Sequence, residues 1–287
     1  MTEHEAGSLK SLPSSVRRSA ELLVSRYVEE EGSLSPPINV LSLAKIAGAR
    51  VVDGDHDLAG LTLQSASGHV ISLGRKSRIA QTRLTRRARF TLAHEIGHVI
   101  VDSARSPEDD LSFATGQTVE TICNKLAENL LMPDSVMNEL FVLKLHDEVT
   151  IENIFELARV FDVSVEAVAR RLSSLDLLKG ARILGWRYAR PRQKKWGELT
   201  CAWIVGDAWD HQNARLLNSG RESCALRAFR TATMQVGTES VSIDHQIVTS
   251  RAVAAPHGRF WVVEVLTPSA IPAQRDQSSP EDEPATE

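Results

Sequence analysis

The segment RFTLAHEIGHVIV at residues 89–101 constrains this chain more than any other, because it contains the pattern H-E-x-x-H at His94, Glu95 and His98. Side chains four residues apart lie on the same face of an α-helix, one turn apart. Two imidazoles so placed can bind one metal ion, and the intervening glutamate can reach a water on that metal. The pattern therefore predicts a metal-dependent hydrolase with Glu95 as its general base.

The residues around the motif decide between this interpretation and chance, since so short a pattern also arises by accident in a chain with nine histidines. The apolar side chains of this segment repeat at helical spacing and predict a largely buried helix; they are Phe90, Leu92, Ile96, Val99 and Ile100. Burying two imidazoles and a carboxylate is costly unless they have a partner. A metal ion supplies that partner, so we favour the catalytic metal site.

A second helix is predicted at residues 118–133, where apolar residues again recur at helical spacing and Pro133 ends the pattern. Glu120, near its start, is the candidate third ligand, although a first-turn glutamate is also favoured by the helix dipole alone. Glu128 is the rival, but between Ala127 and Asn129 it is expected to be solvated. Two histidines and one glutamate form the ligand set of thermolysin-type zinc sites, although Mn²⁺ or another divalent ion is compatible with the same ligands.

The two motifs together, RFTLAHEIGH at 89–98 and E-T-I-C-N-x-x-A-x-x-L-L-M-P at 120–133, resemble those of the ImmA/IrrE family of bacterial metallopeptidases. The second motif is most similar to the IrrE branch, which regulates the response to radiation and DNA damage. The resemblance implies an α+β fold with a thermolysin-like, gluzincin-type core. It also implies that His94, His98 and Glu120 bind Zn²⁺ and that Glu95 is the catalytic base.

The same resemblance implies a narrow substrate. Proteins of this family cleave a helix–turn–helix transcriptional repressor, DdrO in the IrrE branch, and so derepress stress genes. The expected activity is therefore a site-specific, zinc-dependent metalloendopeptidase with such a repressor as its protein partner. A broad-specificity peptidase is a weaker alternative.

Composition limits the remaining function classes. The 287 residues are 42% hydrophobic and 24% charged, as in ordinary globular proteins. No apolar run approaches the roughly 20 residues that span a membrane, and the N-terminus lacks the apolar stretch of a secretory signal. Three cysteines without paired spacing favour the reducing cytoplasm, and a net charge of −4 argues against a general nucleic-acid binder. We expect a cytoplasmic protein without a membrane anchor.

The region before the metal motif is predicted to contain helices at 13–31, capped by Ser14 or Ser15, and at 39–49, closed by Gly48. A strand from Val51 and a hairpin at 60–74 follow. The edge of this hairpin either holds an extended peptide substrate by strand addition or is an ordinary sheet edge. His69 in the hairpin is expected to be a surface residue rather than a further ligand.

Two polar segments flank the metal helix. Residues 75–89 are basic and are expected to form its solvated face, or alternatively a patch that attracts an acidic partner. Residues 102–117 are expected to form a loop that acts as a lid or substrate wall.

Residues 149–172 are predicted to form a helix–turn–helix pair with Thr150 and Ser164 as N-caps. The second helix offers Arg170 and Arg171 as basic groups but no Asn, Gln or Lys for base contacts, so a structural or protein-binding pair is favoured over DNA binding. The pair nevertheless supports an alternative function, a metal-binding transcriptional regulator that acts without proteolysis. Glu95 weakens that alternative, because metal binding alone does not need it.

Beyond Gly180 the composition predicts strands, at 182–188, 200–205, 223–229, 240–248 and 259–266. This region resembles the GAF-like α/β domain that the IrrE branch carries, which implies either a small-molecule sensor or a scaffold and dimerisation module. Trp186, Trp203 and Trp261 are expected in its core. The predicted domains are thus a metallopeptidase at 1–140, a helix–turn–helix segment at 141–179, a GAF-like domain at 180–273 and a disordered acidic tail at 274–287.

Overall fold

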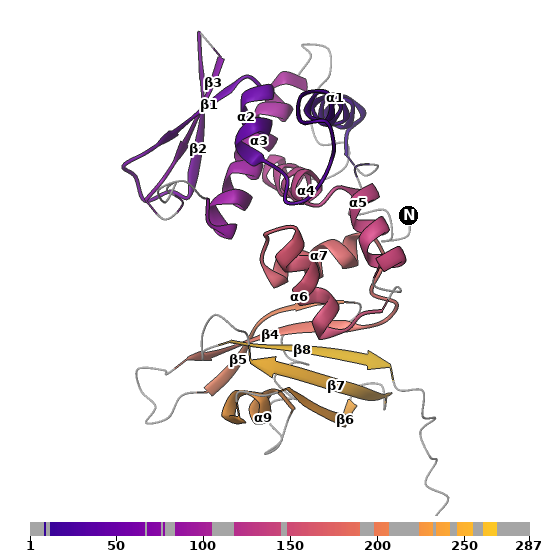
Figure 1. Ribbon diagram of the computed structural model, residues 1–287. Coiled ribbons are helices and arrows are strands. Elements are labelled where there is room, and N and C mark those ends of the chain that lie inside the picture. The colour runs from indigo at the N-terminus through magenta and orange to yellow at the C-terminus, as the bar shows by residue number, and fades with distance from the viewer. Residues whose placement is uncertain are drawn as a thin grey trace, which may run out of the picture. The chain divides into compact units, whose positions relative to one another are not determined.

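The computed structural model divides the chain into two compact units, residues 1–179 and 180–287, and each is described by itself (Figure 1). The structure describes residues 9, 12–66, 68–75, 77, 84–104, 118–144, 148–189, 198–206, 224–231, 234–241, 246–254 and 261–268. The predicted tail at 274–287 and most of the predicted lid at 102–117 lie outside these residues. Within the described part, no helix combines the length and apolar character needed to cross a bilayer.

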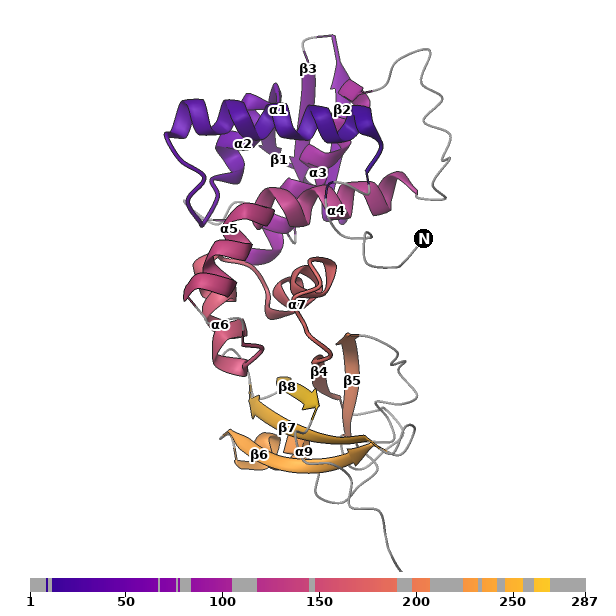
Figure 2. The same cartoon turned by 90° about the vertical axis from the view of Figure 1, so that its right-hand side faces the viewer.

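The first unit is organised around one helix, α3 (Arg86–Ala104), which carries the H-E-x-x-H pattern. It packs against α1 (Ser14–Glu31), α2 (Val40–Ile46) and α4 (Val119–Leu131), and on its other side against two strands (Figures 1 and 2). Leu92, Ile96 and Ile100 are among its buried residues, which confirms the predicted apolar side. The metal motif therefore lies in the middle of the unit.

Helix ends follow local sequence signals in most places. The side chains of Thr118, Thr150 and Ser164 accept hydrogen bonds from backbone N–H groups at 3.2, 3.2 and 3.1 Å and cap the helices that follow. Gly48 has the left-handed φ of +78° that ends α2. The predicted Ser14 or Ser15 cap is wrong, because Pro13 holds the N-cap position and α1 has no side-chain cap bond.

A three-stranded sheet covers α3 on the side away from α4. It contains β1 (Ala49–Asp53), β2 (Gly60–Ser65) and β3 (Gly68–Leu73) in the order β1-β3-β2. β2 and β3 form the predicted hairpin, antiparallel with Gly60 opposite Leu73, while β1 runs parallel to β3. β2 is consequently an edge strand that packs directly on α3.

Helices α5 (Asp134–Asn138), η3 (Glu139–Lys144), α6 (Ile151–Val160) and α7 (Val165–Ser174) follow α4. The predicted helix pair is α6 and α7. Arg171 on α7 is fully buried and donates to the Met132 carbonyl at 2.9 Å and to Asp134. Its expected role as an exposed basic group is wrong, because this long-range ion pair draws it into the core. That the pair is structural or protein-binding rather than DNA-binding stays a prediction.

The basic segment before the motif is only partly solvated. Arg87 is exposed as expected, whereas Arg89 is buried and donates to the backbone carbonyls of Ile38 and Asp162 at 2.9 and 3.2 Å. For Arg89 the predicted solvated face is therefore wrong. Its guanidinium instead ties α3 to the turn between α6 and α7.

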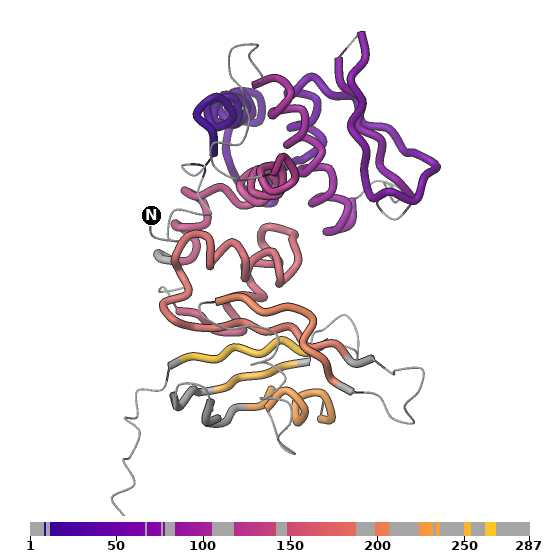
Figure 3. Tube along the Cα trace, turned by 180° about the vertical axis from the view of Figure 1, so that it is seen from behind, coloured from indigo at the N-terminus to yellow at the C-terminus, as the bar shows by residue number. Residues whose placement is uncertain are grey.

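In its described residues, the second unit is an antiparallel sheet with helix α9 packed on it (Figure 3). Its elements are β4 (Arg182–Ala189), β5 (Glu198–Val205), α9 (Cys224–Thr231), β6 (Gln235–Val241), β7 (Gln246–Ala254) and β8 (Trp261–Pro268). The strand order is β5-β4-β8-β7-β6, and α9 packs on β6, β7 and β8.

Two strand predictions in this unit need correction. Residues 223–229 were expected to be a strand, yet Cys224 begins α9, because Cys224, Ala225 and Ala228 are spaced to bury one face of a helix. The strand expected at 240–248 instead overlaps the end of β6 and the start of β7, and residues 242–245 lie outside the described part.

The core of this unit contains the predicted tryptophans that the structure describes. Trp186 and Trp203 are buried, and the side chain of Trp261 lies outside the described residues. Trp186 also donates to the buried carboxylate of Glu264 at 2.7 Å, and Ser250 donates to the other oxygen at 2.6 Å. The unit thus has a mixed α and β architecture, while its GAF-like assignment stays a prediction.

Candidate metal centre

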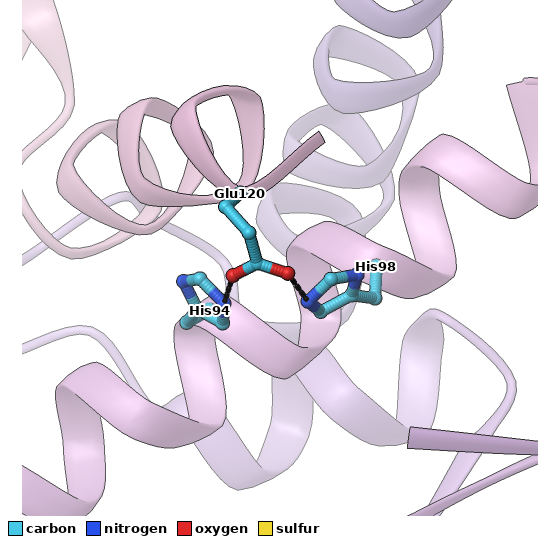
Figure 4. Close-up of side chains that lie close together, drawn as sticks. All are labelled: His94, His98 and Glu120. Carbon is cyan, nitrogen blue, oxygen red and sulfur yellow. Dashed lines mark ion pairs between the residues drawn. The ribbon is translucent and has the colours of Figure 1, made fainter. Parts of the chain in front are cut away.

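The structure brings the three predicted ligands together where α3 meets the first turn of α4. His94 and His98 lie one turn apart on α3, with ring centroids 5.0 Å apart. Glu120 lies between them, with its two oxygens 3.2 Å from Nε2 of His94 and 3.5 Å from Nε2 of His98 (Figure 4). One ligand atom from each residue lies within 4.8 Å of the others.

This arrangement fits a divalent metal ion. Ligand atoms bound at about 2.0–2.1 Å around a tetrahedral ion lie roughly 3.3 Å apart, and each histidine Nε2 lies at a similar distance, 3.2 or 3.5 Å, from one of the two Glu120 oxygens. Two imidazole nitrogens and one carboxylate oxygen are donors that Zn²⁺ accepts readily, and other divalent ions also use them. Among the residues that the structure describes, no second cluster of this kind is found.

A glycine allows the two ligand helices to approach each other. A Cβ on Gly97 would lie 3.0 Å from Cα and 3.1 Å from Cβ of Cys123 on α4. Any larger residue at position 97 would therefore push the helices apart. Cys123 is buried at this contact, and its burial, reinforced by Glu120 and Glu95, raises the pKa of its thiol to about 12.

Asn124 orients the first ligand. Its Oδ1 lies 2.9 Å from Nδ1 of His94, and an amide oxygen can only accept a hydrogen bond. The proton of His94 is therefore on Nδ1, and Nε2 presents its lone pair toward Glu120. Asn124 follows Glu120 by four residues on α4, so one face of that helix supplies both a ligand and the partner of a ligand.

Glu95 lies beside the two histidines on α3 and contacts β2. It is 6% exposed and accepts a hydrogen bond of 2.7 Å from the hydroxyl of Thr62. One cleft of about 530 Å³ is lined both by Glu95 and by the three predicted ligands. Its other lining residues are Leu58, Ala59, Gly60, Leu61, Thr62, Phe90, Thr91 and Asp102. A carboxylate that shares a cleft with a metal cluster can take a proton from a water bound there.

The alternative ligands lie elsewhere. Glu128 is not part of the cluster, and it is half-buried rather than solvated as predicted. Burial raises the pKa of Glu128, against the opposing attraction of Arg171 and two other cations. The prediction that His69 is a plain surface residue is wrong too: its Nε2 is buried, 3.9 Å from Asp102, and outside the metal cluster.

Sequence reasoning missed Thr62, Gly97 and Asn124. The spacing of Asn124 from Glu120 was a usable signal, because the two share a helix face. Gly97 lay inside the motif but gave no sign of what it contacts. Thr62 is 33 residues from Glu95, so only the pairing of hairpin and helix reveals their hydrogen bond.

The fold and this site together define a class of protein. In this class two helices carry a candidate metal site of the metal-hydrolase type, and an edge strand lies beside it. In agreement with that class, residues 78–173 match the Peptidase M78 family, described as the IrrE N-terminal-like domain. The matched range includes α3 and α4 with all four predicted site residues. It supports the resemblance to the ImmA/IrrE family, while closeness to the IrrE branch stays a prediction.

A solved structure described as a Mycobacterium tuberculosis transcriptional regulator is similar to this chain, with 17% sequence identity and a TM-score of 0.54. The similarity covers 93% of this chain and 80% of that one. At this identity the likeness shows a common fold. No match was found among curated proteins.

Proposed function

We propose that this protein is a metal-dependent endopeptidase that cleaves a helix–turn–helix transcriptional repressor, with Zn²⁺ as its metal. The observation that carries the proposal is Glu95, a buried carboxylate that lines the same cleft as His94, His98 and Glu120. A site that only bound metal would have no use for it. The match of residues 78–173 to a peptidase family supports the same conclusion.

In the proposed reaction His94, His98 and Glu120 hold the ion, which when bound polarises the scissile carbonyl and acidifies a water. Asn124 keeps His94 in the tautomer that can bind. Glu95 accepts the proton of the attacking water and then donates it to the leaving amine. Burial keeps Glu95 away from bulk solvent, and its hydrogen bond from Thr62 holds the carboxylate in place.

The location of the cleft supports a peptide as substrate. Gly60, Leu61 and Thr62 line it, and they belong to β2, the edge strand of its sheet. An edge strand offers unpaired backbone groups to which an extended peptide can add. The choice of a repressor, DdrO-like or otherwise, rests on the resemblance to the ImmA/IrrE family.

The decisive experiment incubates the full chain, loaded with Zn²⁺ or Mn²⁺, with the helix–turn–helix repressor encoded nearest its gene. Wild type is compared with Glu95→Gln, which preserves side-chain shape, and products are measured by intact mass. We expect a single cut that disappears in the variant while bound metal, measured by elemental analysis, is retained. Cleavage that persists in Glu95→Gln would contradict the proposal.

A regulator that binds without proteolysis is the alternative, and the structure described as a transcriptional regulator is in keeping with it. The basic residues of α7 give little support to DNA binding, because Arg171 is buried and Arg170 pairs with Glu166 at 2.8 Å. No cleavage by metal-loaded wild type, together with sequence-specific DNA binding, would favour this alternative. In either case we propose that the second unit acts as a GAF-like sensor or scaffold domain.

A further inference from the structure

We propose that Thr62 is a positioning residue for Glu95 and that it links the docking of a peptide on β2 to the placement of the catalytic base. This inference rests on the proposed peptidase function. It concerns a residue outside both metal motifs, on a strand that packs against the metal helix.

The side chain of Thr62 holds one oxygen of Glu95. Its hydroxyl lies 2.7 Å from Oε2 and 3.3 Å from the backbone carbonyl of the same residue. A hydroxyl has one proton to donate, and the shorter contact shows that the carboxylate receives it. Hydrogen bonds to an ionised acceptor are the stronger kind, so this bond fixes the carboxylate well.

Gly60, two residues earlier on β2, limits the other oxygen. A Cβ at position 60 would lie 2.5 Å from Oε1 and 2.8 Å from Cγ of Glu95. The strand backbone therefore packs directly against this side of the carboxylate. β2 thus contacts both oxygens of Glu95, one by a hydrogen bond and one by close packing.

Within the described part of the chain, the backbone of Thr62 belongs to the free edge of the sheet. The N–H of Gly74 donates to the carbonyl of Ala59 at 3.0 Å, and these residues continue the register in which Gly60 faces Leu73. Antiparallel pairs alternate between bonded and non-bonded positions, so Leu61 and Leu63 direct their backbone groups toward β3. Gly60, Thr62 and Gln64 then direct their backbone N–H and C=O groups to the free edge, where a peptide would bind.

Thr62 consequently takes part both in the docking of a peptide on β2 and in the placement of Glu95. A peptide that adds to the edge bonds to the main chain of Thr62 or its neighbours and fixes the strand. The fixed strand in turn holds the Thr62 hydroxyl against Glu95. The side chain is needed for the chemical step and the backbone for binding, which predicts that the two can be separated by mutation.

The experiment uses the zinc-loaded full chain and four variants: Thr62→Val, Thr62→Ser, Glu95→Gln and, as a control with the same chemical change, Thr200→Val on β5. Thr62→Val keeps the β-branched shape and the backbone but loses the donor. We expect its kcat to fall about 10- to 100-fold on the repressor, with KM and Zn²⁺ affinity changed less than about threefold. Thr62→Ser should recover most of kcat, and Thr200→Val should match wild type.

A readout that needs no substrate accompanies the kinetics. In crystal structures of the zinc-loaded variants, the Glu95 carboxylate should leave its position in Thr62→Val and keep it in Thr62→Ser. A Thr62→Val protein with wild-type kcat, or with Glu95 in place, would overturn the inference. So would a loss that Thr62→Ser shares equally.

The two proposals fail in distinguishable ways. If wild type cuts nothing, or if Glu95→Gln cuts as fast as wild type, the peptidase function fails, and the crystal structures still decide whether Thr62 positions Glu95. If Glu95→Gln is inactive and Thr62→Val is fully active, the peptidase function stands and the role of Thr62 is wrong.

Discussion

Gly97 on α3 and Cys123 on α4 approach so closely that a Cβ on the glycine would lie 3.0 Å from the Cα of the cysteine. Gly97 stands next to His98, and Cys123 stands three residues after Glu120. The absence of a side chain at position 97 therefore sets the helix separation at which Glu120 meets both histidines. A packing contact between two helices thus determines whether three residues can share one metal ion.

Replacement of Gly97 by alanine tests this dependence. Alanine favours an ordinary helix by about 1 kcal/mol, whereas overpacking a helix contact costs about 1–3 kcal/mol. We expect the second effect to win, so that the free energy of unfolding falls and Zn²⁺ affinity drops about 10-fold. Ser103→Ala, at an exposed position of the same helix, is the matched control. Higher stability of Gly97→Ala with unchanged affinity would show that the contact does not set the site.

Removal of the Asn124 side chain should weaken metal binding without unfolding the protein. Asn124→Ala leaves Nδ1 of His94 without its acceptor, and loss of such a partner lowers metal affinity about 10- to 100-fold. Asn124→Asp keeps an acceptor and should stay close to wild type. Competition with a chromogenic chelator measures both affinities, and melting of the metal-free proteins controls for folding. Equal affinities for wild type and Asn124→Ala would refute the assigned role.

The neighbouring arginines of α7 should respond very differently to truncation. Arg171→Ala removes a fully buried guanidinium with its bonds to Asp134 and to the Met132 carbonyl, and it should cost about 3–5 kcal/mol of unfolding free energy. Arg170→Ala removes an exposed pair with Glu166 and should cost less than about 1 kcal/mol. Urea denaturation checks both values. A large loss of sequence-specific DNA affinity in Arg170→Ala, which keeps the fold, would instead support the non-proteolytic regulator.

Stability should depend on pH through Glu128. Burial raises the pKa of this carboxyl above its ordinary value of 4.5, so the folded chain holds the proton more tightly than the unfolded chain. The group therefore lowers stability as pH rises from about 4.5 through the raised value. Glu128→Gln should be more stable than wild type at about pH 7, and the difference should vanish below about pH 4. Denaturation of metal-free protein at both pH values measures it, and a less stable variant at neutral pH would contradict this sign.

Local patterns carried much of the prediction. The four-residue spacing of His94 and His98 and the apolar repeats around them were sufficient for α3, because a helix fixes which side chains share a face. Thr150 and Ser164 were predicted as caps because a cap acts within three residues of itself. The hairpin of β2 and β3 was predicted for the same reason, since alternation and a short turn are local.

Where prediction failed, the deciding contact was distant in sequence. Arg171 looked like an exposed basic residue, and its burial depends on Met132 and Asp134 on the preceding helices. Glu128 and His69 were expected in solvent, and packing against other elements leaves both of them half-buried. The strand expected at 223–229 became α9, because short apolar runs fit either period until a sheet is available to pack against.

The sequence by itself determined which residues could bind a metal, since ligand type and helical spacing are written locally in His94, Glu95, His98 and Glu120. Tertiary structure alone decided that Glu120 comes within 3.5 Å of both histidines and that Thr62 holds Glu95. The reason is physical. Periodicity fixes the face of a helix or strand on which a side chain lies, whereas the residue that this side chain contacts depends on how closely separate elements pack.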